Sequence, residues 1–554
     1  MLTLPLAPTD DRANPAFKDA AGCAKWLAQL QLTNLHQAHA ALRTQLDELN
    51  RYPMRGLERL HTMELLRETV AALQTDYAKK LAIRKLPLSE SELTVFVSII
   101  ALWQSMVSGY QRCLQSHMAG DTLLVSYGAL LCQRCLTYSG LQIFEHLRMG
   151  YEFDGKLWQQ LHALYAFCEE QDWLTQEISD PPRANLRASK KTARSGTGPS
   201  CNATYIKVLL ACYADWAELT RQQLQILDRW LTLWSPTLTL EHGYTASKED
   251  AQPLALDLVG TLGLQPLKLV QRGSSVRYLN MAPLSKLLRV KSILLQQGHT
   301  PQQLELGNGC NSADCGWLLN CLHQYWCEER GNRALERQDA AVQAQMCYSL
   351  DGCFAYITNR PFKQPSGDRM VDTLSRKQIA AFGHVLSDTD RHDLAQMGFM
   401  LETWQVQDES VRGARLLRAE SSGIRLGVSQ LVALRTLDAN GFMTGTVSWV
   451  KVTQNGQLHA GVRYLPGIPQ AISMKATGIN ISTSNLYVAT LLLPPVLALK
   501  SPASLIIPRE WFKPGRVVEL ILADKTKMYV QMQFSVEKGV DYERISFSES
   551  SAPA

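Results

Sequence analysis

The first third of the chain has apolar residues at the three- and four-residue spacing of amphipathic helices. One such face contains Leu35, Leu42, Leu46 and Leu49, and the next contains Met63, Leu66, Val70, Leu73 and Tyr77. Ser89 and Glu92 have the spacing of a capping box ahead of the apolar run that begins at Leu93. The pattern predicts a helical N-terminal region over residues 1–178, with further helices at about 121–148 and 153–170.

The composition changes after this region. Residues 179–202 are rich in Pro, Gly, Ser and basic residues, which predicts a flexible basic loop. We expect its basic side chains to be solvated, with contact to an acidic partner as the alternative. Residues 203–329 then read as a helical and mixed region. It has a helical stripe at 203–234, β-like runs (LALDLVGTL and PLKLVQR), and helices at 283–297 and about 315–330.

From about residue 338, short β-type runs alternate with turn residues. Strong hairpin signals stand at Asp351-Gly352, Asn440-Gly441 and Asn455-Gly456. A helical pattern at about 375–397 interrupts the series as an insertion, and a second, smaller β-rich domain is predicted over 479–549. The predicted fold class is therefore α+β multidomain, with helices first and two β units after them.

Composition and charge narrow the class of protein. A chain of 554 residues is too long for one compact core, and its apolar content of 46% is that of a globular protein. A net charge of +5 does not suggest a nucleic-acid surface. The longest apolar runs are short or broken by proline, so we expect no membrane span, and the N-terminus does not resemble a signal peptide. Thirteen unevenly spaced cysteines favour reduced thiols and a cytoplasmic location.

Two short motifs stand in the β-rich half. The first is Arg333-Ala-Leu-Glu-Arg337, immediately before the first β-type run, and the second is Asp408-Glu-Ser410-Val-Arg-Gly413, at a predicted turn between two strands. Together they resemble the RxxxR and (D/N)xSxxG motifs of the PilZ family. The GTVSWV and HAGVRYL runs resemble the last strands of a PilZ barrel. The resemblance implies a PilZ-like β-barrel over about 330–475, with the helical insertion accounting for the 71 positions between Arg337 and Asp408.

The resemblance also implies a ligand, cyclic di-GMP, which is a dianion with two guanines. An arginine fork matches both a guanine O6/N7 edge and a phosphate, so Arg333 and Arg337 would clamp the nucleotide. Asp408 would accept hydrogen bonds from guanine N1–H and N2–H, and Ser410 would supply a hydroxyl group. Gly413 is expected where a side chain would block the turn or require a positive φ. Because the arginines lie at the junction with the helical region, we expect binding to order that junction.

The resemblance implies a bacterial, cytoplasmic receptor or effector in signal transduction, and we expect no enzyme activity, no cofactor and no metal. It would pass ligand binding to a protein partner through the helical region or the C-terminal β domain. The alternative is a scaffold or adaptor whose PilZ-like barrel has lost its nucleotide. On that interpretation Arg333 and Arg337 are solvated helix residues, and the second motif is an ordinary turn.

Two cysteine patterns are weaker candidates for chemistry. Cys132 and Cys135 have redox-motif spacing but lie in an apolar helical context without the strand that such a site needs. Four cysteines and His323 between residues 310 and 327 invite a zinc hypothesis, yet Cys321 and Cys327 would face different sides of a helix. We expect these cysteines to be structural.

Overall fold

The computed structural model describes most of the chain. The described residues are 2–81, 85–178, 198–214, 219–244, 251–328, 338–339, 342–365, 394–418, 423–477 and 486–551. They divide into two compact units. Unit 1 comprises residues 1–84 and 88–333, and unit 2 comprises residues 85–87 and 334–554. Most of the loop at 179–202 and most of the insertion at 375–397 lie outside the described residues.

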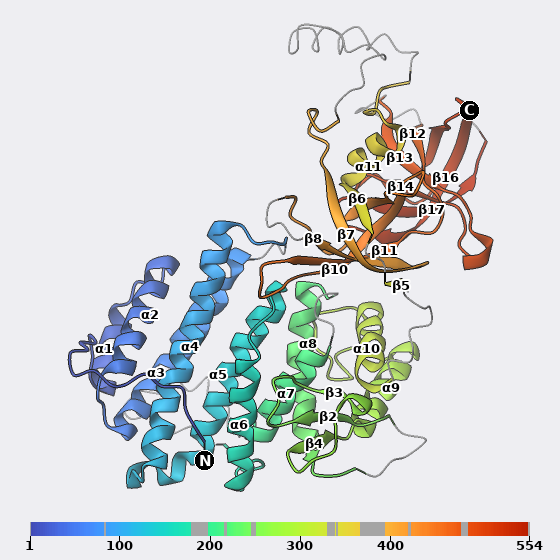
Figure 1. Ribbon diagram of the computed structural model, residues 1–554. Coiled ribbons are helices and arrows are strands. Elements are labelled where there is room, and N and C mark those ends of the chain that lie inside the picture. The colour runs from blue at the N-terminus through green and yellow to red at the C-terminus, as the bar shows by residue number, and fades with distance from the viewer. Residues whose placement is uncertain are drawn as a thin grey trace. The chain divides into compact units, whose positions relative to one another are not determined.

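Unit 1 is mainly helical, and its helices lie side by side in Figure 1. They are α1 (Ala20–Gln29), α2 (Leu35–Arg51), α3 (Gly56–Tyr77), α4 (Glu90–Met118), α5 (Gly128–Met149), α6 (Lys156–Glu170), α7 (Cys201–Tyr213), α8 (Arg221–Trp234), α9 (Ala282–Gln296) and α10 (Ser312–Cys327). Short 3-10 turns follow α3 and precede α5, at Ala78–Leu81 and Thr122–Tyr127.

The predicted helical faces form the core of unit 1. All five residues of the second face, from Met63 to Tyr77, are buried in α3, and Leu42, Leu46 and Leu49 are buried in α2. The capping box is present as well. Ser89 accepts a hydrogen bond from the Glu92 amide, and the Glu92 side chain accepts from the Ser89 amide. Local propensity and tertiary packing therefore agree at these helices.

Helix α4 is long and apolar enough to cross a membrane by length and composition, and half of its apolar window is buried inside the protein. It packs against α2, α3 and α5. Its buried side chains include Ser105, Gln111 and Arg112, and the Arg112 guanidinium donates to the backbone carbonyl of Asn50 at 3.0 Å. The buried Arg112 side chain is thus hydrogen-bonded within unit 1, as buried polar groups usually are.

A small antiparallel sheet joins the later helices of unit 1. Its order is β1-β4-β2-β3, with β1 at Leu240–Glu241, β2 at Leu254–Asp257, β3 at Gln265–Pro266 and β4 at Val276–Leu279. The prediction that all cysteines are reduced is wrong at one place, because Cys310 and Cys315 form a disulfide before and within the first turn of α10. The loop between them brings their Cα atoms to 6.0 Å, a normal separation for a disulfide.

Unit 2 begins with a closed six-stranded barrel, here called barrel 1. Its strands are β6 (Gln343–Tyr348), β7 (Leu401–Ser410), β8 (Gly413–Arg418), β9 (Leu431–Thr436), β10 (Met443–Val452) and β11 (Leu458–Tyr464). They pair in the order β7-β6-β9-β10-β11-β8, and β7–β8 pairing closes the ring. A two-residue strand, β5 (Gln338–Asp339), also pairs with β7. Asn440-Gly441 and Asn455-Gly456 lie in the turns around β10, as predicted.

The predicted hairpin at Asp351-Gly352 is wrong, because these residues lie in a helix, α11 (Ser349–Thr358). Leu350, Cys353 and Phe354 recur at helical spacing and are all buried. Ser349 has a positive φ of 64° and its hydroxyl accepts a hydrogen bond from the Gly352 amide, which starts the helix directly after β6. Burial of this apolar face overrides the turn preference of the Asp-Gly pair.

A second closed barrel, barrel 2, ends the chain. Its strands are β12 (Gln470–Ala476), β13 (Val488–Leu493), β14 (Ser504–Ile507), β15 (Val517–Ile521), β16 (Lys527–Lys538) and β17 (Glu543–Glu549), in the order β12-β13-β14-β17-β16-β15. Its interior is apolar, with Met474, Leu505, Leu520 and Met532 among the residues that are fully buried.

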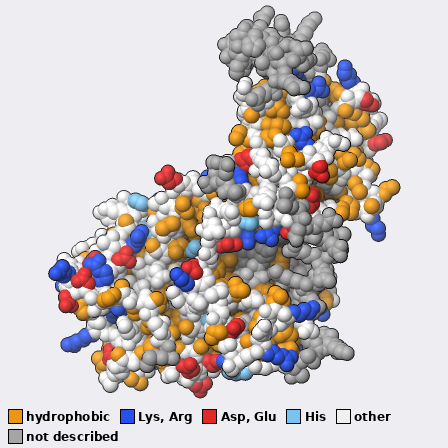
Figure 2. Space-filling model, in the orientation of Figure 1, with side chains coloured by type: hydrophobic (Ala, Val, Ile, Leu, Met, Phe, Trp, Pro, Cys, Tyr) orange, Lys and Arg blue, Asp and Glu red, His pale blue; other side chains and the backbone are white. Residues whose placement is uncertain are grey.

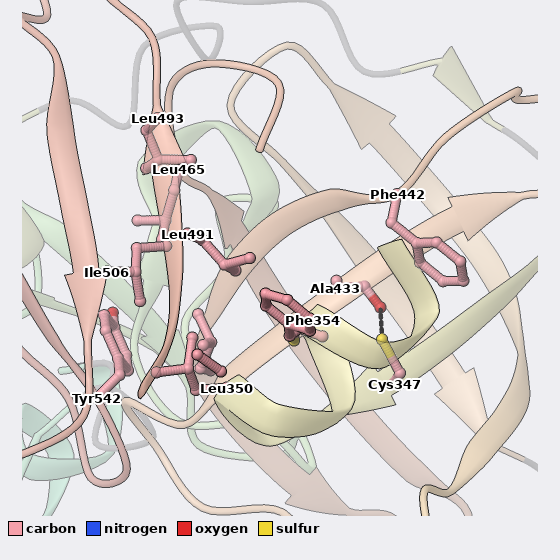
Figure 3. Close-up of a cluster of buried hydrophobic side chains, with 13 residues drawn as sticks. Cys347, Leu350, Phe354, Ala433, Phe442, Leu465, Leu491, Leu493, Ile506 and Tyr542 are labelled. Atoms are coloured by element: carbon pink, nitrogen blue, oxygen red, sulfur yellow. Dashed lines mark hydrogen bonds between the residues drawn. The ribbon is translucent and has the colours of Figure 1, made fainter. Parts of the chain in front are cut away.

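One hydrophobic cluster joins the two barrels through α11 (Figure 3). Barrel 1 and α11 contribute Cys347, Leu350, Cys353, Phe354, Leu431, Ala433, Phe442 and Leu465, and barrel 2 contributes Ala489, Leu491, Leu493, Ile506 and Tyr542. Figure 3 shows Leu350 and Phe354 on α11 between side chains from the two sides. The two closed barrels therefore share a hydrophobic cluster at their junction, in addition to the apolar interior of barrel 2.

Candidate functional site

The second motif lies at the hairpin between β7 and β8. Ser410 ends β7 and Gly413 begins β8, and these two residues pair across a two-residue loop of Val411 and Arg412. The Ser410 hydroxyl donates to the Gly413 carbonyl at 3.2 Å and accepts from the Arg412 amide at 3.4 Å. Ser410 thus fixes the turn, and the loop residue Val411 is 71% exposed.

A β-bulge sets the direction of Asp408. Trp404 and Val406 are buried at alternate positions, which places them inside the barrel. Regular alternation would send Asp408 inward as well. The register between β7 and β8 instead shifts between Val406 and Asp408, and Asp408 pairs with Arg415. Arg415 lies between the buried Ala414 and Leu416, so its side chain is on the outer face of the barrel. Residues that pair across two strands share a face, so Asp408 is also on the outer face. Bulges commonly re-aim a side chain in this way beside a functional site.

Gly413 is required by close packing of the backbone, because its φ is not positive. A Cβ atom at this position would lie 2.2 Å from the Val462 carbonyl oxygen on β11. Gly413 pairs with both Ser410 on β7 and Arg463 on β11, so it stands where three strands meet. The sequence predicted either a blocked side-chain position or a positive φ at Gly413, and the structure confirms the blocked position.

Arg333 and Arg337 lie outside the described residues. The strand that follows them is described, and it reaches the second motif: Gln338 pairs with Glu409, and Asp339 pairs with Asp408. Since Gln338 directly follows Arg337 in the chain, the first motif ends one residue before the strand that lies against the second. Gln338 and Glu409 are 71 positions apart in the sequence, and the pairing of β5 with β7 makes them neighbours.

Three further residues continue the row that starts at Asp408. Arg415 on β8 pairs with Asp408 on one side and with Gly461 on the other, and Gly461 pairs with Trp449 on β10. The indole of Trp449 lies over Gly461, where an added Cβ would fall 2.1 Å from Nε1. The Nε of Arg415 is buried without a hydrogen-bond partner in the described part of the chain. An unpaired buried donor costs free energy, and Arg418 at the other end of the barrel has unpaired buried nitrogens as well.

Sequence reasoning missed Arg415 and Trp449. Trp449 stands inside the GTVSWV run, which was interpreted only as a strand. Nothing in the sequence gives the register that aligns a residue of β10 with one of β7. Trp449 is half-buried and follows a register shift of β10 between Val447 and Trp449, so a regular alternation of residues does not mark its position. A half-buried tryptophan on a barrel strand is a candidate stacking surface.

Barrel 1 has a small cavity of about 50 Å³ beside this row, lined by Val406, Leu416, Glu409, Arg435 and Tyr464 among others. Past the bulge Glu409 turns inward, and it accepts a hydrogen bond from the Tyr464 hydroxyl at 2.6 Å. Burial, and then the Glu409 carboxylate, raise the pKa of Tyr464 well above its usual range. Tyr464 therefore stays a neutral donor, and the cavity is too small for a nucleotide base.

The other end of the barrel interior holds a buried ion pair. Glu402 accepts from Arg418 at 2.8 Å and from the hydroxyl of Tyr348, whose pKa is raised by burial and by the carboxylate. The Arg418 guanidinium lies 5.2 Å from the centre of the Trp404 ring. Removing one partner of such a pair leaves an uncompensated buried charge. We therefore assign these groups a structural role at the end of the barrel away from the motif.

The cysteine candidates take structural positions. Cys132 and Cys135 are both buried in α5, and burial raises the pKa of Cys135, which makes its thiol a poor nucleophile. Cys310 and Cys315 are bonded to each other. His323 contacts the Ser285 hydroxyl at 3.0 Å and the Arg289 guanidinium at 2.9 Å.

Charge on the surface is mixed. Figure 2 shows acidic and basic side chains interspersed with apolar ones on the displayed face. The described side chains in that view gather into no broad basic patch of the kind that binds nucleic acid.

Comparison with known proteins gives matches at both ends of the chain. The family model described as the N-terminal domain of the cyclic-di-GMP receptor FimW matches residues 20–247, and the model described as the FimW C-terminal β-barrel domain matches residues 476–550. Barrel 1 lies between these two segments. A protein of Pseudomonas aeruginosa described as cyclic-di-GMP receptor FimW is 20% identical over 93% of this chain and 88% of its own length. Both domain models of FimW thus match this chain in order, and the chain is similar to a FimW protein along nearly its whole length.

Proposed function

We propose that this protein is a signalling receptor for cyclic di-GMP and that barrel 1 is a PilZ-type barrel that holds the ligand. The observation that carries the proposal is the pairing of β5, which directly follows the arginine motif in the sequence, with Asp408 and Glu409 of β7. The similarity to a protein described as a cyclic-di-GMP receptor supports the same ligand. Neither observation depends on the other.

The ligand would lie on the outer surface of barrel 1 at the β7–β8 hairpin. Arg333 and Arg337 would bind guanine edges or phosphates with their planar forks. The outward Asp408 would accept from guanine N1–H and N2–H. Ser410 and Gly413 would hold the hairpin in place, and the absence of a side chain at Gly413 keeps β8 close to β11.

Arg415 and Trp449 extend the proposed site along the row. Arg415 pairs with Asp408 across β7 and β8, and its planar, charged guanidinium suits a phosphate or guanine oxygen. The Trp449 indole offers a flat surface for a purine, and base–aromatic stacking contributes about 1–3 kcal/mol per base in other nucleotide complexes. The row from Asp408 to Trp449 crosses four strands, or about 14 Å at the usual strand spacing, which is the scale of a dinucleotide.

The role would be non-catalytic and cytoplasmic, with no cofactor. The ligand would act through a protein partner that binds unit 1 or barrel 2. This division of roles follows the division of the chain into a helical region over 1–178 and 203–329, the barrel over 330–475, and the β-rich domain over 479–549.

Calorimetry of the full chain with cyclic di-GMP, GTP and cyclic di-AMP tests the proposal. We expect heat for cyclic di-GMP alone, and we expect Asp408→Ala to weaken the binding while Asp438→Ala does not. Asp438 is an exposed aspartate in the turn after β9 of the same barrel. A folded protein without heat at high micromolar ligand would favour the scaffold alternative instead.

A further inference from the structure

Helix α9 in unit 1 has apolar residues on two faces. Its first face is buried in the unit and contains Leu284, Leu288 and Leu295, and it packs on α10. The second face has Pro283, Leu287, Val290 and Leu294 at positions i, i+4, i+7 and i+11, and Val290 is 45% exposed. An amphipathic helix of a monomer needs only the first face to be apolar, so the second requires a different explanation.

This second face forms one side of a groove of about 430 Å³, here called the α9 groove. The opposite side is the segment of Gln303, Leu304 and Glu305. The Lys291 ammonium donates to the Leu304 carbonyl at 2.5 Å, which links the two sides. The segment is also held from behind, because the Trp230 indole on α8 donates to the Leu306 carbonyl at 3.0 Å. The groove is therefore built before any partner arrives.

Charge around the groove is biased to one sign. Helix α9 has no acidic residue, and its basic residues Lys286 and Lys291 line the groove, whereas Arg289 donates to His323 of α10. Lys286 lines the groove and is exposed, and Glu305 is the one acid among the groove-lining residues in the described part of the chain. A partner that covers the apolar face would meet this basic helix, so carboxylates beside its apolar residues would be favoured.

We propose that the α9 groove binds an amphipathic, acidic helix of a protein partner. The apolar stripe spans three turns of α9, which matches a partner helix with apolar residues at i, i+3 or i+4, and i+7. A bilayer also attracts basic amphipathic helices, but it is flat, whereas the wall of residues 303–305 makes this surface concave. Both family models end outside this region, and the proposal does not depend on the binding of cyclic di-GMP.

The test is a selection of 16-residue peptides from a displayed random library against the full chain, with counter-selection against Val290→Asp. We expect the enriched peptides to have apolar residues at helical spacing and a net negative charge. Their dissociation constants should rise at least about tenfold for Val290→Asp and for Lys286→Glu. Val259→Asp is the matched control, since Val259 is 73% exposed in the turn after β2 of the same unit and does not line the groove. Lys25→Glu on α1 is the control for charge, and neither control should change the affinity.

Four outcomes would overturn the proposal. The first is a selection that enriches nothing over Val290→Asp, and the second is a set of enriched peptides that are neutral or basic. The third is binding of the full chain to vesicles of phosphatidylcholine and phosphatidylserine that Val290→Asp abolishes, which would assign the face to a membrane. The fourth is a concentration-dependent dimer that Val290→Asp dissociates, which would make a second copy the occupant.

Discussion

The two barrels of unit 2 have the same number of strands and are both closed, but they differ in what they place at their surfaces and interiors. Barrel 2 is filled with apolar side chains such as Met474 and Leu520. Barrel 1 places a buried Glu402–Arg418 pair at one end of its interior and a bulged, glycine-dependent hairpin at the other. Closure of a sheet does not require those features, and barrel 2 closes without a buried ion pair of this kind among its described residues.

In barrel 1 the local departures from a regular barrel lie beside the candidate site, whereas the register shifts of barrel 2 lie between β16 and β17. The bulge before Asp408 turns one carboxylate outward, and Gly413 and Gly461 let a backbone and an indole approach closely. Each departure costs stability in an isolated barrel. Barrel 2 shares a hydrophobic cluster with barrel 1 through α11, and we expect burial of this cluster to offset that cost. Barrel 2 is then a support for the barrel that holds the candidate site.

The largest effect should come from removing the shared core. Phe354 is 7% exposed on α11 and belongs to the cluster that contains residues of both barrels. Phe354→Ala should lower the free energy of unfolding by about 3–5 kcal/mol, because it leaves a cavity where the barrels meet. Hydrogen exchange in the full chain should show β9 and β13 losing protection together.

Phe534→Ala is the control for this change. Phe534 is 60% exposed on β16 of barrel 2, so its removal should change stability within about 0.5 kcal/mol. If only β9 loses protection in Phe354→Ala, the barrels are independent. A fragment of residues 325–475 should then fold and bind ligand by itself, whereas the shared core predicts that it does not.

Gly413→Ala should have the next largest effect on stability. The added methyl group meets a carbonyl oxygen of the neighbouring strand, and backbone cannot move aside as a side chain can. We expect a loss of about 1–3 kcal/mol and weaker protection of the β8–β11 pairing. Gly441→Ala in the same barrel is the control, since nothing lies within 4 Å of an added Cβ there. Equal thermal stability of the two variants would contradict the structural role of Gly413.

Variants of the candidate site should weaken ligand binding and leave the fold unchanged. Arg333→Ala and Arg337→Ala should each weaken cyclic di-GMP binding by about 1–3 kcal/mol, the scale of a bidentate arginine–guanine contact. Trp449→Ala should weaken it by a similar or smaller amount. Arg509→Ala, an exposed arginine of barrel 2, is the control in the same calorimetric titration. Wild-type affinity in both motif variants would move the site elsewhere.

Much of the helical fold could be predicted from the sequence, because its signals are local. The α3 face, the Ser89 cap and the Asn-Gly turns need only spacing and residue type. Helix α11 could not be predicted in this way. The pair Asp351-Gly352 favours a turn locally, and it is helical here because Leu350 and Phe354 are buried in the shared cluster. At residues 351 and 352, tertiary packing therefore outweighs the local preference for a turn.

The candidate site was predictable in part for the same reason. Asp408, Ser410 and Gly413 form a local motif, and their place at a turn follows from its residues. Arg415 and Trp449 join them only through strand register and a bulge, which no short pattern encodes. The disulfide between Cys310 and Cys315 was missed because the prediction of reduced thiols rested on the number and spacing of all the cysteines. It did not consider the short loop between these two residues.

The smallest effect we predict is a dependence on pH at the contact between the barrels. Asp541, in the turn between β16 and β17, accepts a hydrogen bond from the Leu431 amide of barrel 1 at 2.9 Å. Burial raises its pKa above the ordinary value of an aspartate. The native state therefore binds the proton more tightly than the unfolded chain does, and ionisation disfavours the fold. Stability contributed by this group should fall as pH rises from about 3.9, the unfolded pKa, up to the native pKa.

Asp541→Asn removes that titration and keeps an oxygen acceptor for the Leu431 amide. The variant should therefore gain stability relative to the wild type as pH rises through this window, as calorimetric unfolding at several pH values would show. Asp524→Asn is a control of opposite sign. Asp524 is exposed, and its hydrogen bond from the Thr526 amide lowers its pKa, so its stabilising effect is present above the unfolded pKa and lost in acid. The Asp524→Asn variant should thus lose stability relative to the wild type at higher pH. If the stability of both variants relative to the wild type changed with pH in the same direction, Asp541 would not be desolvated between the barrels. Water would then reach the edge of the shared hydrophobic cluster.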